Sequence, residues 1–167
     1  MSRKIIHNQL HYFLAILIAF SLQLATLTPL FIVLFALNWI VEGNFSEKLN
    51  NIKQNKIVIV FTSLYIVHLF GLIYTENLKS GWFDMEVKLS MLVFPIIIAS
   101  KPFNIKQVNG IIKSLIISII YVGIYLISRA LIFYFFNIDN VFYYHLFSPF
   151  FHPSYLSLYI NMSVAFV

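Results

Sequence analysis

Long apolar runs alternate with short polar segments along the chain, and the lengths of the runs predict membrane-spanning helices. A helix rises about 1.5 Å per residue, so about 20 apolar residues cross a hydrocarbon core of about 30 Å. The pattern predicts an all-α, polytopic transmembrane helix bundle of about six spans, organised as one domain over residues 1–167. The predicted spans are 10–26, 28–41, 57–74, 81–100, 114–136 and 153–167.

The first apolar run, residues 10–41, is longer than one span requires. Thr28 and Pro29 divide it, because proline disfavours helix at the residue before it and favours the first turn of a new helix. We therefore predict two short spans joined by a tight turn. One long, tilted or kinked helix is the alternative, and it would invert the orientation of all that follows.

Two polar and basic segments, 42–56 and 101–113, are predicted to be solvent-exposed, turn-rich connections. The apolar run 89–100 is too short to cross alone, so its helix is expected to begin near Gly81. The last run ends at Val167 without a polar exit. We therefore expect the final span to be truncated and the chain to be the N-terminal part of a larger protein.

The distribution of basic residues favours the hairpin, because short cytoplasmic loops carry most Lys and Arg. With six spans and a cytoplasmic N-terminus, eight of the 11 basic residues lie inside. These eight are Arg3, Lys4, Lys48, Lys53, Lys56, Lys101, Lys106 and Lys113. A single long first helix would place the last six of them outside. We expect a multi-pass protein of the bacterial inner (cytoplasmic) membrane.

Composition agrees with this class, since 60% of the residues are apolar, 10% are charged and the mean hydropathy is +0.87. Soluble domains carry about 25% charged residues. The net charge of +5 comes from basic residues scattered singly between apolar runs, which does not indicate a nucleic-acid partner. The sequence has no cysteine, and no spacing of His, Asp and Glu predicts a metal site or a cofactor.

Candidate chemistry gathers in segment 71–95, where Asp84, Glu86 and Lys88 interrupt apolar sequence. Lys88 lies about 12 residues, or roughly 18 Å, from the cytoplasmic end of its predicted span, and Arg129 of the fifth span comes out at a similar depth. In one interpretation, both cations extend to outer-leaflet headgroups and Asp84 pairs with Lys88 at i, i+4. In the other, they line a pocket that binds a lipid-linked phosphate or pyrophosphate.

His152 opens the last predicted span as His-Pro-Ser-Tyr, which places Tyr155 one turn into it. A neutral imidazole at the outer mouth of a span suits a general base for a substrate hydroxyl. An interfacial histidine among aromatic residues is the alternative interpretation. His68, within the third span, is interpreted as a helix-packing residue that forms hydrogen bonds.

Two runs resemble a known family. The sequence GLIYTENLKSGWFDMEVKLSMLVFPIII (71–98), preceded by His68-Leu69-Phe70, and HPSYLSLYI (152–160) resemble the N-terminal half of bacterial O-antigen ligase or polymerase-like membrane proteins. The resemblance extends over most of the chain from about Leu10. It implies a GT-C-like glycosyltransferase that transfers an undecaprenyl-pyrophosphate-linked glycan to a lipid A core sugar or a growing polysaccharide at the periplasmic face.

The expected site residues follow from their depth and placement in the predicted spans, and the expected partners are what the resemblance implies. We expect His152 to act as the catalytic base, and Lys88, Arg129, Asp84, Glu86 and Tyr155 to bind substrate. Membrane lipid, the lipid-linked glycan and its acceptor are the expected partners, and this part of the chain is expected to be inactive alone. A transporter or flippase subunit for polysaccharide or lipid, and a structural membrane subunit without a site, are the alternatives.

Overall fold

The computed structural model describes residues 3–24, 27–136, 142–149 and 152–166, and all regular secondary structure in these ranges is helical. The chain forms two compact units, Met1–Asn38 with Asn104–Val167, and Trp39–Phe103, whose boundary falls within a helix. The elements are α1 (Arg3–Ser21), α2 (Thr28–Glu42), α3 (Phe45–Gln54), α4 (Lys56–Gly71), η1 (Leu72–Tyr74), α5 (Leu78–Lys88), α6 (Ser90–Ser100), α7 (Ile105–Phe135), α8 (Tyr144–Phe147) and α9 (Pro153–Ala165).

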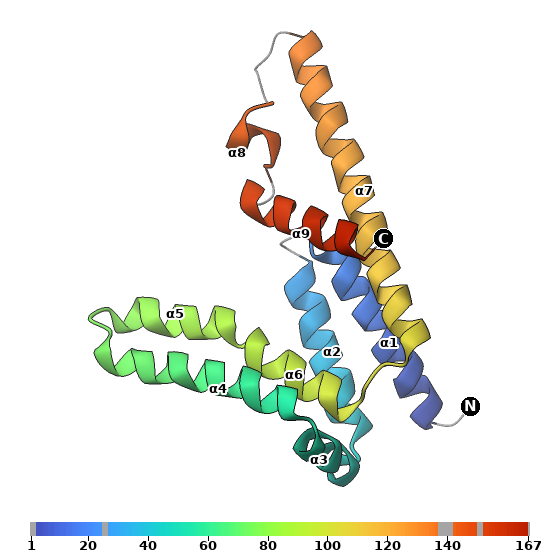
Figure 1. Ribbon diagram of the computed structural model, residues 1–167, viewed down its shortest axis with the longest axis vertical. Helices are drawn as coiled ribbons and strands as arrows, with labels where there is room; N and C mark the ends of the chain where they lie inside the picture. The colour runs from blue at the N-terminus through green and yellow to red at the C-terminus, as the bar shows by residue number, and fades with distance from the viewer. Residues whose placement is uncertain (1–2, 25–26, 137–141, 150–151, 167) are drawn as a thin grey trace. The chain divides into compact units, whose positions relative to one another are not determined.

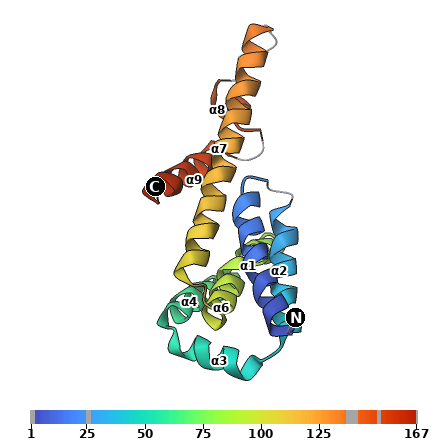
Figure 2. The ribbon, with the colours of Figure 1, turned by 90° about the vertical axis from the view of Figure 1, so that its right-hand side faces the viewer.

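In the first unit, α1 and the part of α2 up to Asn38 form an antiparallel pair (Figure 2). The His11 ring stacks on Phe35 with 4.4 Å between centroids, and Nδ1 of His7 lies 2.8 Å from the side-chain oxygen of Asn38. At the turn, the Thr28 hydroxyl donates to the carbonyl oxygens of Ser21 and Leu24. The two separate helices exclude the alternative of one long first helix.

A stripe of residues spaced by four along α7 packs this unit together. Gly110, Ser114 and Ser118 face α1, where the Ser114 hydroxyl donates to the Ile16 carbonyl at 3.1 Å and the Ser118 hydroxyl donates to that of Phe20. Small residues let two helices approach closely. Further along the same stripe, Val122 and Leu126 pack with Leu156 of α9, and Ala130 is buried.

In the second unit, α4 and η1 run beside α5 and α6, to which they connect through a short turn (Figure 1). Asn77 caps α5 by accepting a hydrogen bond from the Ser80 amide. The predicted helix 81–100 is not continuous, which corrects the expectation of one helix. The chain breaks at Leu89, whose amide donates to the Glu86 carbonyl in a tightened turn, and α6 then contains Pro95.

The two connections predicted to be turn-rich are largely helical, which corrects that prediction. Residues 45–54 form α3, and Ile105 begins α7 nine residues before the predicted start of the span. Lys48 of α3 is buried rather than solvent-exposed. Its ammonium nitrogen lies 3.1 Å from Glu42, donates to the Trp39 carbonyl oxygen and sits over the Trp39 ring.

The Glu42 carboxylate forms ion pairs with both Lys48 and Lys101, and only 6% of the Glu42 side chain is exposed. Burial raises the pKa of this carboxyl group, but the interactions with Lys101 and Lys48 outweigh burial and hold the pKa below its ordinary value of 4.5. Close by, the Trp39 indole donates to the Ser100 hydroxyl at 2.6 Å, and the Asn51 amide donates to the Ser100 carbonyl at 2.9 Å. These contacts join the end of α2, α3 and the end of α6.

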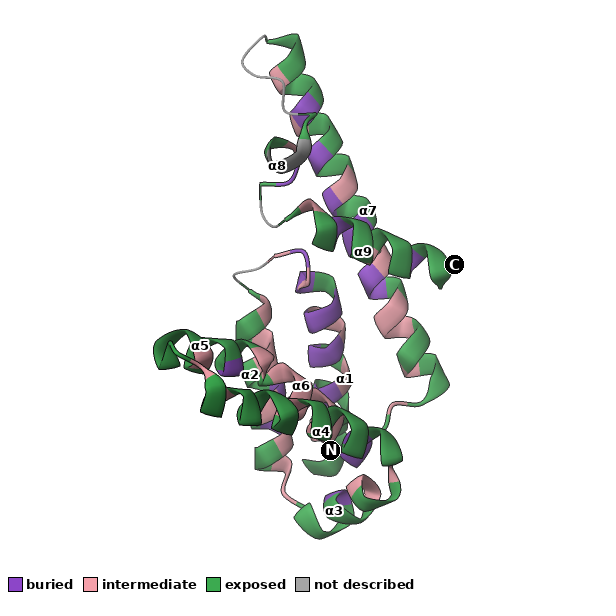
Figure 3. Ribbon diagram, turned by 60° about the vertical axis from the view of Figure 1, so that its left-hand side comes forward, coloured by how far each residue is buried: buried purple, intermediate pink, exposed green. Residues whose placement is uncertain are grey.

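Two helices in the described ranges are long and apolar enough to cross a membrane. One is the segment Lys56–Tyr74, made by α4 and η1, and the other is α7. A third is added if α2 and α3, which meet at 115°, are counted as one broken span. The surface of α4 is almost wholly exposed (Figure 3). An apolar, exposed helix of this length is what a lipid environment accommodates.

Candidate functional site

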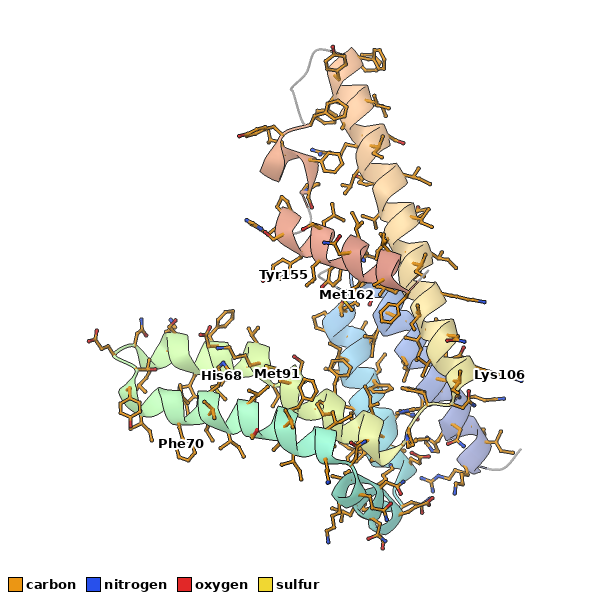
Figure 4. The ribbon with its side chains drawn as sticks, viewed as in Figure 1. His68, Phe70, Met91, Lys106, Tyr155 and Met162 are labelled. Carbon is orange, nitrogen blue, oxygen red and sulfur yellow. The ribbon has the colours of Figure 1, made fainter. Side chains whose placement is uncertain are left out.

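A cavity of about 290 Å³, lined by polar and apolar side chains and called the polar cavity below, lies between the C-terminal part of α4, η1 and α5, which lines it from Gly81 to its last residue, Lys88. The side chain of His68 points from α4 into the space beside α5, whereas Phe70 points away from it (Figure 4). The cavity is lined by Val67, His68, Gly71, Leu72, Thr75, Gly81, Asp84, Met85 and Lys88. It therefore contains two of the residues predicted to bind substrate, Asp84 and Lys88.

Asp84 and Lys88 stand one turn apart on α5, and the ammonium nitrogen lies 3.6 Å from a carboxylate oxygen. Their side chains are 63% and 34% exposed, respectively. A charge-assisted hydrogen bond usually measures about 2.7–2.9 Å, so the two groups make a loose ion pair. The i, i+4 pairing expected in the first interpretation is present, and each group keeps the capacity to bind a ligand.

His68 has a defined tautomer in this arrangement. Its Nδ1 lies 2.8 Å from the backbone carbonyl oxygen of Leu64, which can only accept a hydrogen bond. Nδ1 must therefore carry a proton, and in the neutral ring Nε2 is a hydrogen-bond acceptor. His68 was interpreted as a helix-packing residue that forms hydrogen bonds, but this bond lies within α4 and does not join two helices. The sequence did not indicate the place of His68 in a cavity.

The turn at the end of the cavity is shaped by small residues. A Cβ added to Gly81 would lie 2.6 Å from Cδ2 of Leu72 and 3.3 Å from Cγ2 of Thr75, so the hairpin is close here because residue 81 is glycine. A Cβ added to Gly71 would meet nothing within 4 Å, because that position faces open space. The Thr75 hydroxyl donates to the Gly71 carbonyl at 3.0 Å.

Glu86, the third charged residue of the predicted cluster, faces another direction. Two residues along a helix turn by about 200°, so Asp84 and Glu86 lie on different sides of α5. Glu86 lines a separate cavity of about 480 Å³ with Lys79, Trp82 and Tyr65 among its other residues. The structure therefore brings Asp84 and Lys88 together in one cavity and places Glu86 outside it.

A third cavity in the same unit is almost entirely apolar. It has a volume of about 430 Å³ and lies between the N-terminal half of α4 and α6. Its α4 residues include Val58 and Phe61, and Phe61 is seven positions, or two helical turns, before His68. One side of α4 therefore carries an apolar cavity along its first half and the polar cavity near its end.

Arg129 belongs to the other unit, on α7. Its guanidinium donates to the Leu146 carbonyl oxygen at 2.8 Å and lies over the Phe133 ring, 4.9 Å from the centroid. Arginine has five N–H donors, so this bond leaves most of the fork for other acceptors. The pairing of Arg129 with Lys88 across an anion stays a prediction.

His152 caps the N-terminus of α9. Its Nδ1 accepts from the Ser154 amide at 3.3 Å and lies 2.9 Å from the Ser154 hydroxyl. Because Nδ1 is the acceptor, the proton of the neutral ring is on Nε2, the opposite tautomer to that of His68. A base role for His152 would require the loss of this cap. Tyr155 follows on the exposed surface of α9 (Figure 4).

Within the described residues, no group of three or more His, Asp and Glu side chains is arranged to hold a metal ion. The fold and the cavities define an all-helical protein with two or three helices suited to a membrane. No protein-family model, curated protein sequence or solved structure matches the chain.

Proposed function

We propose that this protein takes part in transferring a lipid-linked glycan, as part of an O-antigen ligase or polymerase-like glycosyltransferase. The proposal is supported by one observation. Two cavities follow one another along the same side of α4, an apolar one beside its first half and the polar cavity near its end. A lipid-linked sugar has the same succession of chemistry, with a hydrocarbon chain joined to a polar group. The resemblance of segment 71–98, which forms most of these cavities, supports the same reading of the site.

The proposed reaction joins an undecaprenyl-pyrophosphate-linked glycan to a lipid A core or to a growing polysaccharide. The acceptor hydroxyl gives its proton to a base, and its oxygen bonds to the anomeric carbon as the bond from that carbon to the pyrophosphate breaks. The electron pair of the broken bond leaves with the lipid pyrophosphate. The remaining N–H donors of Arg129 suit such an anion, since a guanidinium binds phosphate oxygens bidentately.

The proposal includes a GT-C-like bundle of about six spans in the bacterial inner membrane, with the N-terminus in the cytoplasm. Its support is the basic residues at the start of α1, between the end of α2 and the start of α4, and at the start of α7. With this orientation, the end of α4 that carries the polar cavity faces the periplasm. The proposed acceptors are on that side of the membrane.

The test uses the full gene in its native host, with the chromosomal copy deleted and complemented by wild type or by Asp84→Asn. If the protein transfers glycan, the deletion strain and the strain complemented by Asp84→Asn should lose surface glycan. Both should accumulate polymerised or single-unit glycan on undecaprenyl pyrophosphate at the periplasmic face. Accumulation at the cytoplasmic face would instead indicate a flippase. Unchanged surface glycan in the deletion strain would show that the proposal is wrong, and Glu76→Gln serves as an exposed acidic control.

A further inference from the structure

We propose that the polar cavity between α4 and α5 binds the hydroxyl groups of a neutral polyol, in the first instance a sugar ring, and not a phosphate. This deepens the proposed function and rests on it for the source of the ligand. The polar groups that line the cavity are His68, Thr75, Asp84 and Lys88. Their hydrogen-bonding capacity decides which ligand chemistry fits.

Acceptors predominate among these groups. The Asp84 carboxylate only accepts, and Nε2 of neutral His68 accepts because Nδ1 donates to the Leu64 carbonyl. The Thr75 hydroxyl gives its proton to the Gly71 carbonyl, so its oxygen offers lone pairs. Lys88 is the one donor among the four. The complementary ligand must donate several hydrogen bonds and accept at least one, as adjacent hydroxyl groups do.

Charge leads to the same conclusion. Asp84 lies 3.6 Å from the Lys88 ammonium group, so the pair has no net charge. A phosphate at Lys88 would meet the Asp84 carboxylate at short range and could not donate to it in its ionised form. A hydroxyl can accept from Lys88 and donate to Asp84 at once. The loose ion pair allows this, because neither group is saturated by the other.

Size is consistent with one sugar ring. The volume of about 290 Å³ is just below the range of about 300–1,000 Å³ for sites that bind drug-sized molecules, and one sugar ring is smaller than such a molecule. Gly71 leaves open space where another residue would project a side chain, and Gly81 allows the two helices to meet beside the cavity. The apolar cavity along α4 and α6 then offers a place for the hydrocarbon part of the same ligand.

The experiment measures ligand binding directly and needs no transfer activity. The full chain, labelled with ¹⁵N-histidine, is placed in phosphatidylcholine nanodiscs, and the Nε2 resonance of His68 is assigned by comparison with His68→Gln. Three lipids are added in separate titrations. Glucosyl diacylglycerol carries a sugar and no phosphate, phosphatidylglycerol carries a glycerol joined through a phosphate, and phosphatidic acid carries a phosphate and no alcohol hydroxyl.

We expect glucosyl diacylglycerol to shift the His68 resonance in a saturable manner. Asp84→Asn should weaken this binding by about tenfold or more, because it removes a charged hydrogen-bond acceptor. Gly71→Leu should abolish it by filling the cavity while leaving the polar groups intact. Gly123→Leu is the matched control, since Gly123 of α7 also faces open space and lies outside the cavity.

The outcomes separate the two proposals. Saturable binding of glucosyl diacylglycerol supports a polyol site, and so does binding of phosphatidylglycerol when phosphatidic acid does not bind. The tighter of the two identifies the source of the hydroxyls. Binding of phosphatidic acid, alone or together with phosphatidylglycerol, without binding of glucosyl diacylglycerol would overturn the inference. So would the absence of a saturable shift with any lipid while all variants retain wild-type circular dichroism. Failure of glycan transfer in cells with intact sugar binding would count against the proposed function only.

Discussion

The ammonium nitrogen of Lys48 lies 3.1 Å from a carboxylate oxygen of Glu42, and only 6% of each side chain is exposed. Lys101 reaches the other oxygen of the same carboxylate. One carboxylate therefore pairs with two lysines, one from α3 and one from the residue that directly follows α6. In a segment whose charges were predicted to be solvent-exposed, this buried cluster joins three helices.

Substitution of Glu42→Gln should destabilise the protein strongly. It keeps the shape of the side chain but leaves two lysines side by side, with Lys48 buried and without its counter-charge. Breaking a buried ion pair on one side typically costs about 3–5 kcal/mol. Thermal unfolding of the detergent-solubilised protein measures the effect, with Glu76→Gln on the exposed turn as the control. A melting temperature equal to that of the control would contradict the structural role.

The contribution of Glu42 should depend on pH in a defined direction. Its pKa in the folded state is below the ordinary value of 4.5, so the charged form is favoured by folding. The stabilisation is therefore complete above pH 4.5 and is lost as the pH falls through the lowered pKa. The difference in unfolding free energy between wild type and Glu42→Gln should be constant at neutral pH and shrink below pH 4.5. A difference that grows on acidification would refute this assignment.

Helix packing in the first unit should depend on Gly110. A Cβ at this position would collide with the Tyr12 hydroxyl, whereas one at Gly123 on the same helix meets nothing within 4 Å. Gly110→Leu should therefore separate α1 from α7 and destabilise the unit by about 1–3 kcal/mol, as overpacking usually does. Gly123→Leu should have little effect. Equal unfolding temperatures for the two variants would show that α1 and α7 do not approach here as described.

The predicted orientation can be tested with single cysteines, because the natural sequence has none. Glu76 lies on the exposed turn after η1, and Lys106 is exposed at the start of α7 (Figure 4). Glu76→Cys should react with a membrane-impermeant maleimide added to intact spheroplasts. Lys106→Cys should react only after the cells are opened. The reverse labelling pattern would place the N-terminus and the polar cavity on the opposite sides from those proposed.

The sequence pattern predicted the apolar helices well where a proline or a capping residue marked the start of the helix. The prediction of a helix over 57–74 is matched by α4 and η1 over Lys56–Tyr74, and Asn55 caps its start by accepting from the Ile57 amide. The division of the first run at Thr28 and Pro29 is confirmed by α2, which begins at Thr28. Prolines and caps act within one turn, so they can be read without the fold.

The missed helix α3 and the missed first nine residues of α7 carried local signals that their polar composition obscured. In α3, Phe45, Leu49 and Ile52 have the i, i+4, i+7 spacing of an amphipathic helix. Asn104 and Gln107 form a capping box at the start of α7, in which each side chain accepts from the backbone amide of the other residue. The helix α3 and the true start of α7 were therefore open to prediction from short-range sequence.

The polar cavity was only partly open to prediction. Asp84 and Lys88 were expected to pair because i, i+4 residues share a helix face, and they do. The inclusion of His68 depends on the hairpin that brings α5 back along α4, and its tautomer depends on the Leu64 carbonyl. Glu86 lies apart from Asp84 because two residues along a helix point to different sides of it. Grouping these residues by their closeness in sequence did not take this rotation into account.

By itself, the sequence determined an all-helical protein with helices suited to a membrane, because apolar length, proline position and caps are local properties. Only the tertiary structure decided which polar groups share a cavity and which lysine is buried. Glu42 and Lys101 are 59 positions apart, and Ser114 and Ile16 are 98 apart. Contacts of that range arise when helices pack, and pairing over such distances has no signature in the spacing of residues along the chain.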